Sequence, residues 1–421
     1  MTKILKGWFK LAGWKQIICG LIAGILTGLI LKDKAVYLQP VGLIFIRMIQ
    51  MLVVPVVMTA IVCAVISIQD ISKMGKMLIK ALGIYGCTMA ISATIGILIA
   101  KGLNVGHGFL FSATDKVPET VATHTLSLGE VLINFVPTSP VQAFATNNVM
   151  QILFFAFLFG LALRLVGDKG KPVKDLFLSL SDVVFRFAQL VVGFAPYGVF
   201  ALIASVIGHY GITALLPLIK FVSAVYLSCG ILIIVIYGSG LILNRINPKV
   251  FFRSVSSALI TAFTTSSSAA TLPVTMRCAR ENLKINRSVS DFLLPLGATL
   301  NLNGLAIYLS VATIFSANLF GITLGLSQYF TLVITIVFAA AGAAAIPGSG
   351  LIVMSAVMTS VGVPLAAMPI IAGVDRFNDM AQTMTNVAGD LFATTLIAKS
   401  EKMIGVEDQT TTTVDAELQV I

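Results

Sequence analysis

Carboxylate and amide side chains recur at helical spacing in an otherwise apolar stretch near the end of the chain. Asp375, Asp379, Gln382, Asn386 and Asp390 are separated by four, three, four and four positions. At 100° per residue they share one face of a helix. On a membrane-buried helix such carboxylates are costly unless they are paired, and they mark the path of a substrate or an ion.

The composition places this helix in a membrane. Over 421 residues the mean hydropathy is +0.98, 57% of residues are hydrophobic and 11% are charged. Soluble domains carry about 25% charged residues. The chain has room for about eight spanning segments of around 20 residues each. The sequence therefore predicts an all-α polytopic membrane protein.

The net charge of +10 indicates the membrane topology rather than a nucleic-acid partner. The basic residues are spread between the apolar segments instead of forming one basic face. These residues are Lys3, Lys6, Lys10, Lys15, Lys73, Lys76, Lys80, Lys169, Lys171, Lys174, Arg245, Lys249, Arg253, Lys399 and Lys402. If all of them face the cytoplasm, both termini lie inside and the number of crossings is even. The five cysteines show no CxxC spacing, so neither a disulfide framework nor a zinc site is expected.

Interruptions appear in the apolar pattern after residue 250. Clear apolar segments cover 16–32, 40–69, 78–101, 130–166, 182–208 and 215–243, and the fourth is broken into several pieces by Pro137, Pro140 and Asn147-Asn148. Beyond them come a Thr/Ser run at 264–268, an Asn-containing break at 297–304 and a Pro/Gly segment at 346–350. Non-helical backbone at membrane depth survives only where protein or a water-filled cavity receives it. We predict re-entrant hairpins at 255–277 and 330–366, an unwound seventh helix at 287–318 and an eighth helix at 370–398.

Each interruption could have a purely structural role or a functional one. The serines at 266–268 could ease helix packing, or a hairpin tip could direct hydroxyl and amide groups at an anion. A serine hydrolase would need a base, and His107, His124 and His209 lie outside these segments. Asn301 and Asn303 could cap the break or bind a hard cation. Asp375 and Asp379 could form an ion pair with Arg376, which would leave Asp390 unexplained.

Several motifs together resemble the dicarboxylate/amino acid:cation symporter family, the family of the glutamate transporters. The motifs are the segment 45–55, the segments 134–138 and 148–152, the segment 195–200, the serine-rich run, Gly297–Gly304, Ile346–Gly350 and Asn386–Asp390. The resemblance covers essentially the whole chain. It implies eight transmembrane helices plus two re-entrant helical hairpins, in a homotrimer that works as an elevator.

In that family a static scaffold holds a moving transport domain. The resemblance implies that 1–77 and 104–210 form the scaffold and that 78–103 and 211–400 form the transport domain, followed by a cytoplasmic tail at 401–421. The expected location is the plasma or inner membrane, with multiple passes and both termini in the cytoplasm. The expected partners are an amino acid, the lipid bilayer and two further copies of the chain.

The resemblance also implies a substrate site. Its residues would be Ser266, Ser267, Ser268, Leu305, Ile346, Pro347, Gly350, Asp379, Gln382, Thr383 and Asn386. Asp379 would bind the substrate amino group, whereas the serines and Asn386 would hold the α-carboxylate. Members that take acidic substrates carry an arginine at the place of Gln382 and a threonine at that of Leu305. Glutamine cannot replace the bidentate arginine–carboxylate pair, so we expect a neutral amino acid. Arg376 could instead reach an acidic side chain, although pairing with Asp375 or Asp379 is favoured.

The coupling ion implied by the resemblance is Na⁺. One site would use the Gly297 carbonyl, Asn301, Asn386 and Asp390, and a second the main chain at Thr299 and at Ala340, Ala341 and Ala343. A third would use Tyr85, Thr88 and Asn303. In this third site, Met89 replaces a hydroxyl residue of the family and Asn303 replaces an aspartate. Coupling to fewer than three sodium ions is therefore expected. Leu309 occupies the place of the glutamate found in proton- and potassium-coupled members.

The leading hypothesis is therefore sodium-driven import of a neutral amino acid. The alternative within the same fold is proton-coupled uptake of an acidic amino acid or a dicarboxylate through Arg376. An anion-conducting channel is less favoured because Asp379 and Asp390 are both present. An enzyme is not expected, since neither a catalytic base nor a metal cluster accompanies the serines.

Overall fold

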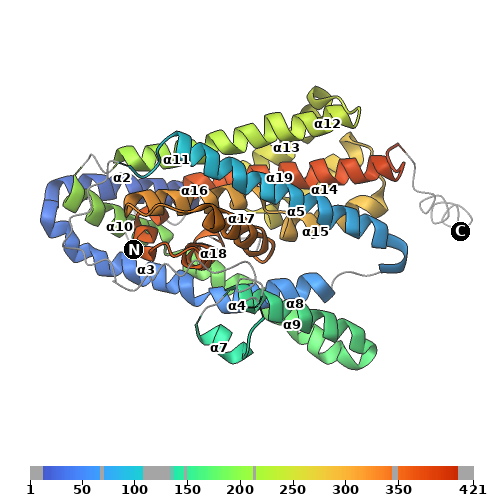
Figure 1. The fold of residues 1–421 in the computed structure, drawn as a ribbon, viewed down its shortest axis with the longest axis horizontal. Helices are drawn as coiled ribbons and strands as arrows, with labels where there is room; N and C mark the ends of the chain where they lie inside the picture. Colours follow the sequence, from blue (N-terminus) through green and yellow to red (C-terminus); the bar gives the residue numbers. More distant parts are fainter. Residues whose placement is uncertain are drawn as a thin grey trace, which may run out of the picture.

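The protein is an elongated bundle of helices (Figure 1). The structure, a computed structural model, describes residues 13–66, 71–107, 133, 136–146, 149–211, 215–343 and 349–405. Across these residues it has helices and turns but no β-strand, and a single bridge joins Ile285 to Ile404. The predicted all-α class is confirmed.

One group of helices is held together by a seam of small residues. It comprises α2 (Gly13–Leu31), the 3₁₀ helix η1 (Lys32–Leu38), α3 (Gln39–Met51) and α10 (Ala195–Tyr210), which pack on one another. A Cβ atom at Gly20, Gly24 or Gly28 would lie 2.4–2.7 Å from a backbone oxygen of α10. Only glycine permits this approach, which is the way small residues bring membrane helices together.

A second set of helices lies along the lower edge of the bundle in Figure 1. Here α4 (Val53–Ile66) packs on α8 (Val149–Val166) and α9 (Lys171–Val192), with η2 (Gly167–Gly170) between the last two. The short α7 (Pro140–Ala145) begins at Ser139, whose hydroxyl accepts a hydrogen bond from the Gln142 amide. Capping of this kind satisfies one of the free amides at a helix start.

The remaining helices surround α19 (Met368–Ser400), the longest helix described. They include α5 (Ile71–Gly102) and a continuous rod made of α11 (Leu215–Ile231), the π-helical η4 (Leu232–Tyr237) and α12 (Gly238–Leu243). Both α5 and α11 contact α19 and α16 (Asn303–Leu319). The polar face of α19 is therefore covered by protein along its length.

The serine run forms a turn between two helices, as predicted. Helix α13 (Pro248–Thr265) ends at Ser266, whose φ of 51° lies in the left-handed region, and α14 (Ser268–Arg277) begins directly after Ser267. The Ser267 hydroxyl accepts a hydrogen bond from the Ala270 amide at 3.2 Å. The local sequence thus ends one helix and caps the next within two residues. A π-helical turn, η5 (Cys278–Asn282), follows α14.

The predicted break in the next helix is also present. Helix α15 (Arg287–Leu300) ends at Asn301, and α16 begins at Asn303. Asn301 and Leu302 have ψ angles of 60° and 65°, outside the helical range. This break exposes backbone groups in the middle of the bundle, so it needs partners from neighbouring helices.

The second predicted hairpin is described on both sides of its tip. Helix α17 (Leu326–Ala341) and helix α18 (Ser349–Ser360) pack on each other and on α16, and η6 (Leu365–Ala367) leads into α19. The predicted site residues Ile346 and Pro347 lie outside the described residues, as do Asn134 and Asn148 of the motifs.

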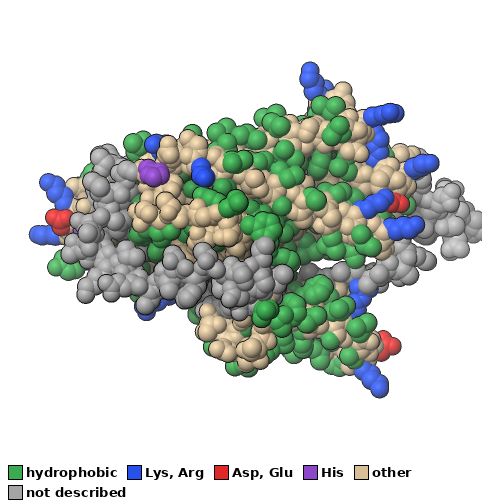
Figure 2. Space-filling view, viewed as in Figure 1, with side chains coloured by type: hydrophobic (Ala, Val, Ile, Leu, Met, Phe, Trp, Pro, Cys, Tyr) green, Lys and Arg blue, Asp and Glu red, His purple; other side chains and the backbone are tan. Residues whose placement is uncertain are grey.

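Four helices in the described part of the chain are long and apolar enough to cross a membrane. They cover Lys15–Phe45, Gly75–Gly102, Leu216–Leu243 and Arg287–Leu319, and Ala195–His209 and Leu326–Ala341 are shorter apolar helices. In Figure 2, Lys and Arg side chains gather at the ends of the long axis, whereas the middle is mainly apolar. This distribution fits a membrane protein, and the count of eight crossings stays a prediction.

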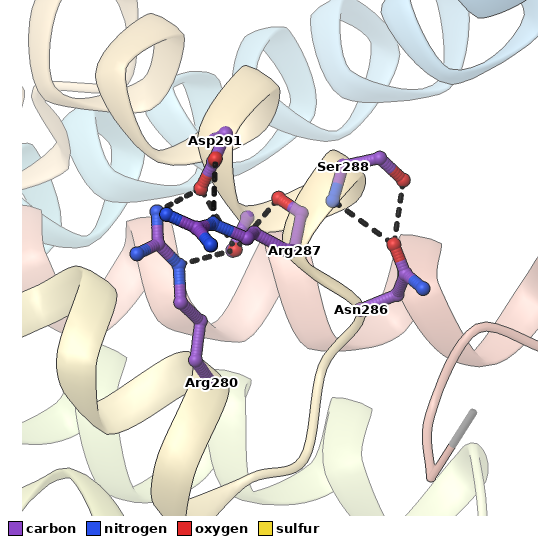
Figure 3. A network of polar contacts seen from close by, with 6 residues as sticks. Arg280, Asn286, Arg287, Ser288 and Asp291 are labelled. Carbon is purple, nitrogen blue, oxygen red and sulfur yellow. Dashed lines mark hydrogen bonds and ion pairs between the residues drawn. The ribbon is translucent and has the colours of Figure 1, made fainter. Parts of the chain in front are cut away.

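Polar contacts tie η5, the start of α15 and the residues after α19 together. Asp291 accepts a hydrogen bond from Arg280 and lies 3.7 Å from Arg287 Nε, and Asn286 caps α15 (Figure 3). The residues after α19 return to the same place. The Asn286 amide donates to the Met403 carbonyl at 3.0 Å, and the Gly405 amide to the Lys284 carbonyl at 2.8 Å. With the Ile285–Ile404 bridge these contacts form a clasp, residues 284–286 with 403–405.

Candidate functional site

The polar face of α19 is buried along its whole length. Asp375, Asp379, Gln382, Asn386 and Asp390 are all less than 10% exposed, and all lie on this one helix. Helices α13, α15, α16 and α11 pack against it. Buried polar groups need hydrogen-bond partners, so the partners of each residue indicate what the face is built to do.

Arg376 connects the start of this face to the serine turn. Its Nη1 lies 3.5 Å from Asp379 Oδ2, and its Nη2 donates to the Thr265 carbonyl at 3.3 Å. Arg376 Nε and the hydroxyl of Ser266, the residue after Thr265, are buried and have no hydrogen-bond partner. Each of these two donors, one on the serine turn and one on the arginine bonded to that turn, could be satisfied by a group with acceptor oxygens.

Asp375 has a different partner from the one considered at first. The Tyr308 hydroxyl donates to Asp375 Oδ1 at 2.6 Å, and Tyr308 is completely buried between Phe221 and the second hairpin. A Cβ atom at Gly350 would lie 2.9 Å from the Tyr308 ring, so α18 rests directly on it. Because Tyr308 satisfies Asp375, Arg376 pairs with Asp379.

Backbone contacts place Gln382 and Leu305 beside the same region. A Cβ atom at Gly304 would lie 2.2 Å from the Gln382 carbonyl oxygen, so α16 and α19 touch through their main chains there. Leu305 is buried and lies against Gly350 of the second hairpin. Thr383, next to Gln382, is buried as well. The described residues predicted to bind substrate therefore form one connected region.

Asn386 caps the break before α16. Its Oδ1 accepts a hydrogen bond from the Gly304 amide at 2.7 Å. The side-chain amide nitrogen of Asn386 is the group that could donate to a substrate carboxylate. The capping role considered for Asn301 and Asn303 is therefore filled here by Asn386, a residue predicted as a ligand.

Asp390 is the centre of a second polar region, farther along α19. Its Oδ1 accepts a hydrogen bond from Asn301 Nδ2 at 3.0 Å. A Cβ atom at Gly297 would lie 2.7 Å from Asp390 Oδ1 and 3.0 Å from the Tyr85 hydroxyl, which donates to the Leu293 carbonyl. The main chain of α15 thus lies directly against the carboxylate. Carboxylate, amide and main-chain oxygens are the ligands that hard cations prefer.

The residues predicted for a second cation site lie on helices that touch. Thr299 is near the end of α15, and its hydroxyl donates to the Leu296 carbonyl. Ala340 and Ala341 end α17, and the Ala340 carbonyl accepts from the Ala343 amide at 3.2 Å. Helix α17 contacts α15, which is compatible with the predicted main-chain site.

The residues predicted for a third site meet between α5 and the helix break. Thr88 lies 3.5 Å from Asn301 Oδ1, and Asn303 Nδ2 donates to Asn301 Oδ1 at 2.8 Å. The Ser92 hydroxyl lies 3.4 Å from Asn303 Oδ1. Sequence reasoning missed Ser92, which supplies a hydroxyl near the position where Met89 lacks one. Its spacing of four from Thr88 was the available signal.

Sequence reasoning also missed Tyr237. This residue ends the π-helical segment, stacks on Phe392 with ring centroids 4.7 Å apart and is completely buried. A Cβ atom at Gly389 would lie 2.6 Å from both the Tyr237 hydroxyl and Asn303 Nδ2. A π-helical turn inside a long helix often marks a functional position, but the sequence of this apolar helix carries no clear signal for it.

Comparison with known proteins assigns a class to this arrangement. The profile of the sodium:dicarboxylate symporter family matches residues 14–400. The proton/sodium-glutamate symport protein of Geobacillus stearothermophilus is 34% identical over 410 residues, which is 95% of this chain and 96% of that protein.

Two further relatives are named for a dicarboxylate and for glutamate. The C4-dicarboxylate transport protein of Rhodospirillum rubrum is 34% identical over 392 residues, 92% of this chain and 88% of that protein. The proton/sodium-glutamate symport protein of Bacillus subtilis is 32% identical over 397 residues, 92% of each chain.

Proposed function

Because this chain belongs to the sodium:dicarboxylate symporter family, we propose that it carries an acidic amino acid across a membrane together with sodium ions. The family and the relatives are transporters rather than enzymes, and the chain is a multi-pass membrane symporter. The identity of the substrate, the number of coupled sodium ions and the oligomeric assembly are proposals.

The observation that carries the proposal is the setting of Arg376. The guanidinium is partly buried beside the serine turn, and its buried Nε and the Ser266 hydroxyl are both without partners. A substrate carboxylate at this place would accept hydrogen bonds from both, and charge-assisted bonds from arginine are about twice as strong as neutral ones. The substrates in the relatives' names, glutamate and C4-dicarboxylates, also favour an acidic solute over the neutral amino acid expected from Gln382.

Asp379 favours an amino acid over a simple dicarboxylate. It is a buried carboxylate within 3.5 Å of Arg376. A substrate ammonium group would be attracted to it, whereas a dicarboxylate without an amino group would add only like charge. We therefore assign the amino group to Asp379 and a carboxylate to Arg376 and Ser266, with Asn386 as a further donor.

Sodium is supported by the family and by the region around Asp390. The family is named for sodium, and the glutamate symport relatives are named for both proton and sodium. Asp390 with Asn301, Tyr85 and the main chain at Gly297 offers an oxygen-rich environment with a full negative charge. Coupling to fewer than three sodium ions remains our proposal, because Asn303 brings no charge to the third set of residues.

Uptake into proteoliposomes tests the proposal. With an inward sodium gradient, labelled glutamate or aspartate should accumulate at least 10-fold faster than serine or alanine. Arg376→Gln should reduce the apparent affinity for the acidic substrate by about 30-fold, because a buried charge pair loses one partner. Lys220→Gln, on the neighbouring α11, is the control for loss of a positive charge. Faster uptake of neutral amino acids by the native protein would refute the acidic assignment.

Gln382 supports a neutral amino acid as the second candidate. Its side chain is buried and uncharged, and its main chain contacts the start of α16. If the native substrate is a neutral amino acid, Gln382→Arg should raise the uptake rate of glutamate or aspartate at least 10-fold from a low native level. If the native protein already prefers acidic substrates, Gln382 is not the selector of the side chain.

The scaffold and elevator arrangement is a further part of the proposal. Two features support it: α2, α3 and α10 form one tightly packed group, and α5 with α11–α19 forms another. We propose that the first group, with α4, α8 and α9, holds a homotrimer while the second moves. Both termini would face the cytoplasm. Native mass spectrometry in detergent would give the subunit number, and a mass of one or two chains would exclude the trimer.

A further inference from the structure

A tyrosine hydroxyl beside the Asp390 region is buried without a hydrogen-bond partner. Tyr237 is the last residue of η4, the π-helical turn between α11 and α12, and its side chain is completely buried. Its hydroxyl has no hydrogen-bond partner among the described residues. An unpaired hydroxyl in protein is unfavourable, so its place in the fold calls for a physical reason.

Packing rather than hydrogen bonding holds the Tyr237 ring in place. The ring stacks on Phe392 of α19, with centroids 4.7 Å apart and an angle of 22° between the planes. A Cβ atom at Gly240 would lie 2.6 Å from the Phe392 ring, so α12 lies directly against this side chain. Removing only the hydroxyl should therefore leave the ring where it is.

The hydroxyl faces the side-chain amide of Asn303. A Cβ atom at Gly389 would lie 2.6 Å from the Tyr237 hydroxyl, 2.6 Å from Asn303 Nδ2 and 3.2 Å from Asn301 Nδ2. Because all three atoms lie this close to one point, they are neighbours, and glycine at position 389 places no side chain between them. A possible acceptor, the hydroxyl, thus stands next to a donor, the Asn303 amide.

The amide oxygen of Asn301 already has two donors. Asn303 Nδ2 donates to it at 2.8 Å, and the Thr88 hydroxyl donates at 3.5 Å. An amide oxygen has two lone pairs, and these two donors use both. A cation that binds this oxygen in the Asp390 region therefore has to displace one of them.

The donor that has to leave is the Asn303 amide. The Thr88 hydroxyl also donates to the Ile84 carbonyl at 2.9 Å, and its oxygen can face a cation. An amide nitrogen can only donate, so its hydrogens would be repelled by the cation. The other side-chain atom of Asn303, Oδ1, lies 3.4 Å from the Ser92 hydroxyl. The unpaired oxygen of Tyr237 is next to the displaced nitrogen.

We infer that Tyr237 is a positioning residue of the cation site, whose hydroxyl accepts a hydrogen bond from the Asn303 amide when a cation takes the Asn301 oxygen. The inference rests on the proposed sodium coupling. The hydroxyl is unpaired in the empty site and paired in the loaded site, so it favours the loaded site. An aspartate at position 303 would have no amide hydrogen to give, so this role of Tyr237 depends on Asn303.

Sodium-dependent thermal unfolding of Tyr237→Phe tests the inference, because this change keeps the ring and removes only the hydroxyl. Purified protein without substrate is heated at increasing NaCl, with choline chloride keeping the ionic strength constant. The native melting temperature should rise with sodium, as expected for a ligand of the folded state. In Tyr237→Phe the sodium concentration that gives half of this rise should be about 10-fold higher, the effect of one lost hydrogen bond. The melting temperature without sodium should not fall, since no bond is lost there.

A control on the same helical rod separates this role from a structural one. Tyr226 of α11 donates to the Phe377 carbonyl at 2.8 Å. Tyr226→Phe should lower the melting temperature both with and without sodium and keep the native sodium concentration for half of the rise.

A double variant tests the link between Tyr237 and Asn303. Asn303→Ala removes the amide that the hydroxyl is inferred to receive. Adding Tyr237→Phe to Asn303→Ala should therefore weaken sodium binding no further, whereas independent residues would give additive losses. A second 10-fold loss in the double variant would overturn the inference.

The remaining outcomes distinguish the inference from the proposed function. Native sodium affinity in Tyr237→Phe, a lower melting temperature of this variant without sodium, or its failure to fold would each overturn the role of the hydroxyl and leave sodium coupling standing. A native protein that sodium neither stabilises nor drives in uptake would overturn both.

Discussion

The two ends of the polar face of α19 are built from different chemistry. Around Asp375 and Asp379 the neighbours are a guanidinium, a phenol and serine hydroxyls, and two donors lack partners. Around Asp390 the neighbours are the amide of Asn301, the Tyr85 hydroxyl and main chain at glycine positions. The first region carries charges of both signs, and the second a single carboxylate among neutral groups.

The difference in packing is as informative as the difference in charge. At Gly297 and Gly389 even one added carbon would approach polar atoms to 2.7 Å or less, so the second region is tightly closed. Both regions contain an unsatisfied donor, Ser266 and Arg376 Nε in the first and the Tyr237 hydroxyl in the second. Only the first set includes a guanidinium, which matches the carboxylate of an organic substrate. A close-fitting oxygen shell suits an ion, and an incomplete donor set suits an organic substrate.

The largest effect should come from removing the charge at each end. Asp390→Asn should weaken the apparent sodium affinity by about 100-fold or more, because the carboxylate is the only formal charge described there. Asp379→Ala should weaken substrate binding at every sodium concentration. Sodium titrations of substrate binding would measure both. A native sodium titration curve for Asp390→Asn would contradict the assignment of the Asp390 region to ion binding.

A smaller effect is expected from filling the tight region. Gly389→Ala places a methyl group 2.6 Å from the Tyr237 hydroxyl and from Asn303 Nδ2. We expect about a 10-fold loss of sodium affinity, corresponding to an overpacking cost of about 1–3 kcal/mol. Gly83→Ala, on α5, is the control, since nothing lies within 4 Å of its added carbon. Similar sodium curves for both variants would show that the region is not tightly closed.

Restoring a charge should change the number of ions rather than the affinity for substrate. Asn303→Asp places a carboxylate beside Thr88, Ser92 and Asn301, which should raise the sodium-to-substrate ratio measured from reversal potentials. Because Ser92 already supplies a hydroxyl, adding Met89→Ser should contribute little more. A native ratio of three would show that the uncharged Asn303 does not abolish a third site.

The smallest effect should come from one hydroxyl of the first region. Ser266→Ala removes an unsatisfied donor at the turn without touching the Arg376–Asp379 pair. Loss of one hydrogen bond to a charged group predicts about a 10-fold weaker affinity for the acidic substrate. The sodium dependence at saturating substrate should stay native, and a parallel change in both titrations would place Ser266 in a structural role instead.

The sequence predicted the elements better than the contacts between them. The serine turn, the break at Asn301 and the polar face of α19 were all visible, because polar residues interrupt apolar segments there. The partners of Asp375 and Asn303 were not. Tyr308 is 67 positions from Asp375, and Ser92 is 211 positions from Asn303, so only the tertiary fold brings them together.

The substrate shows the same limit. Gln382 and Leu305 favoured a neutral amino acid, but the structure places the guanidinium of Arg376 at the serine turn, and the relatives are named for acidic solutes. Arg376 and Gln382 stand on one helix, and which of them meets the substrate depends on the hairpin packed above them. That choice could not be made from spacing.

The clasp between residues 284–286 and 403–405 matters for anyone who attaches a reporter to this protein. Its contacts join the start of α15 to the chain that leaves α19. A fluorescent protein or affinity tag joined after Gly405 would leave every one of these contacts in place. A truncation before Met403 would remove the partners of Lys284, Ile285 and Asn286 together, so Gly405 is the earliest position at which the chain can be cut or fused with the clasp intact.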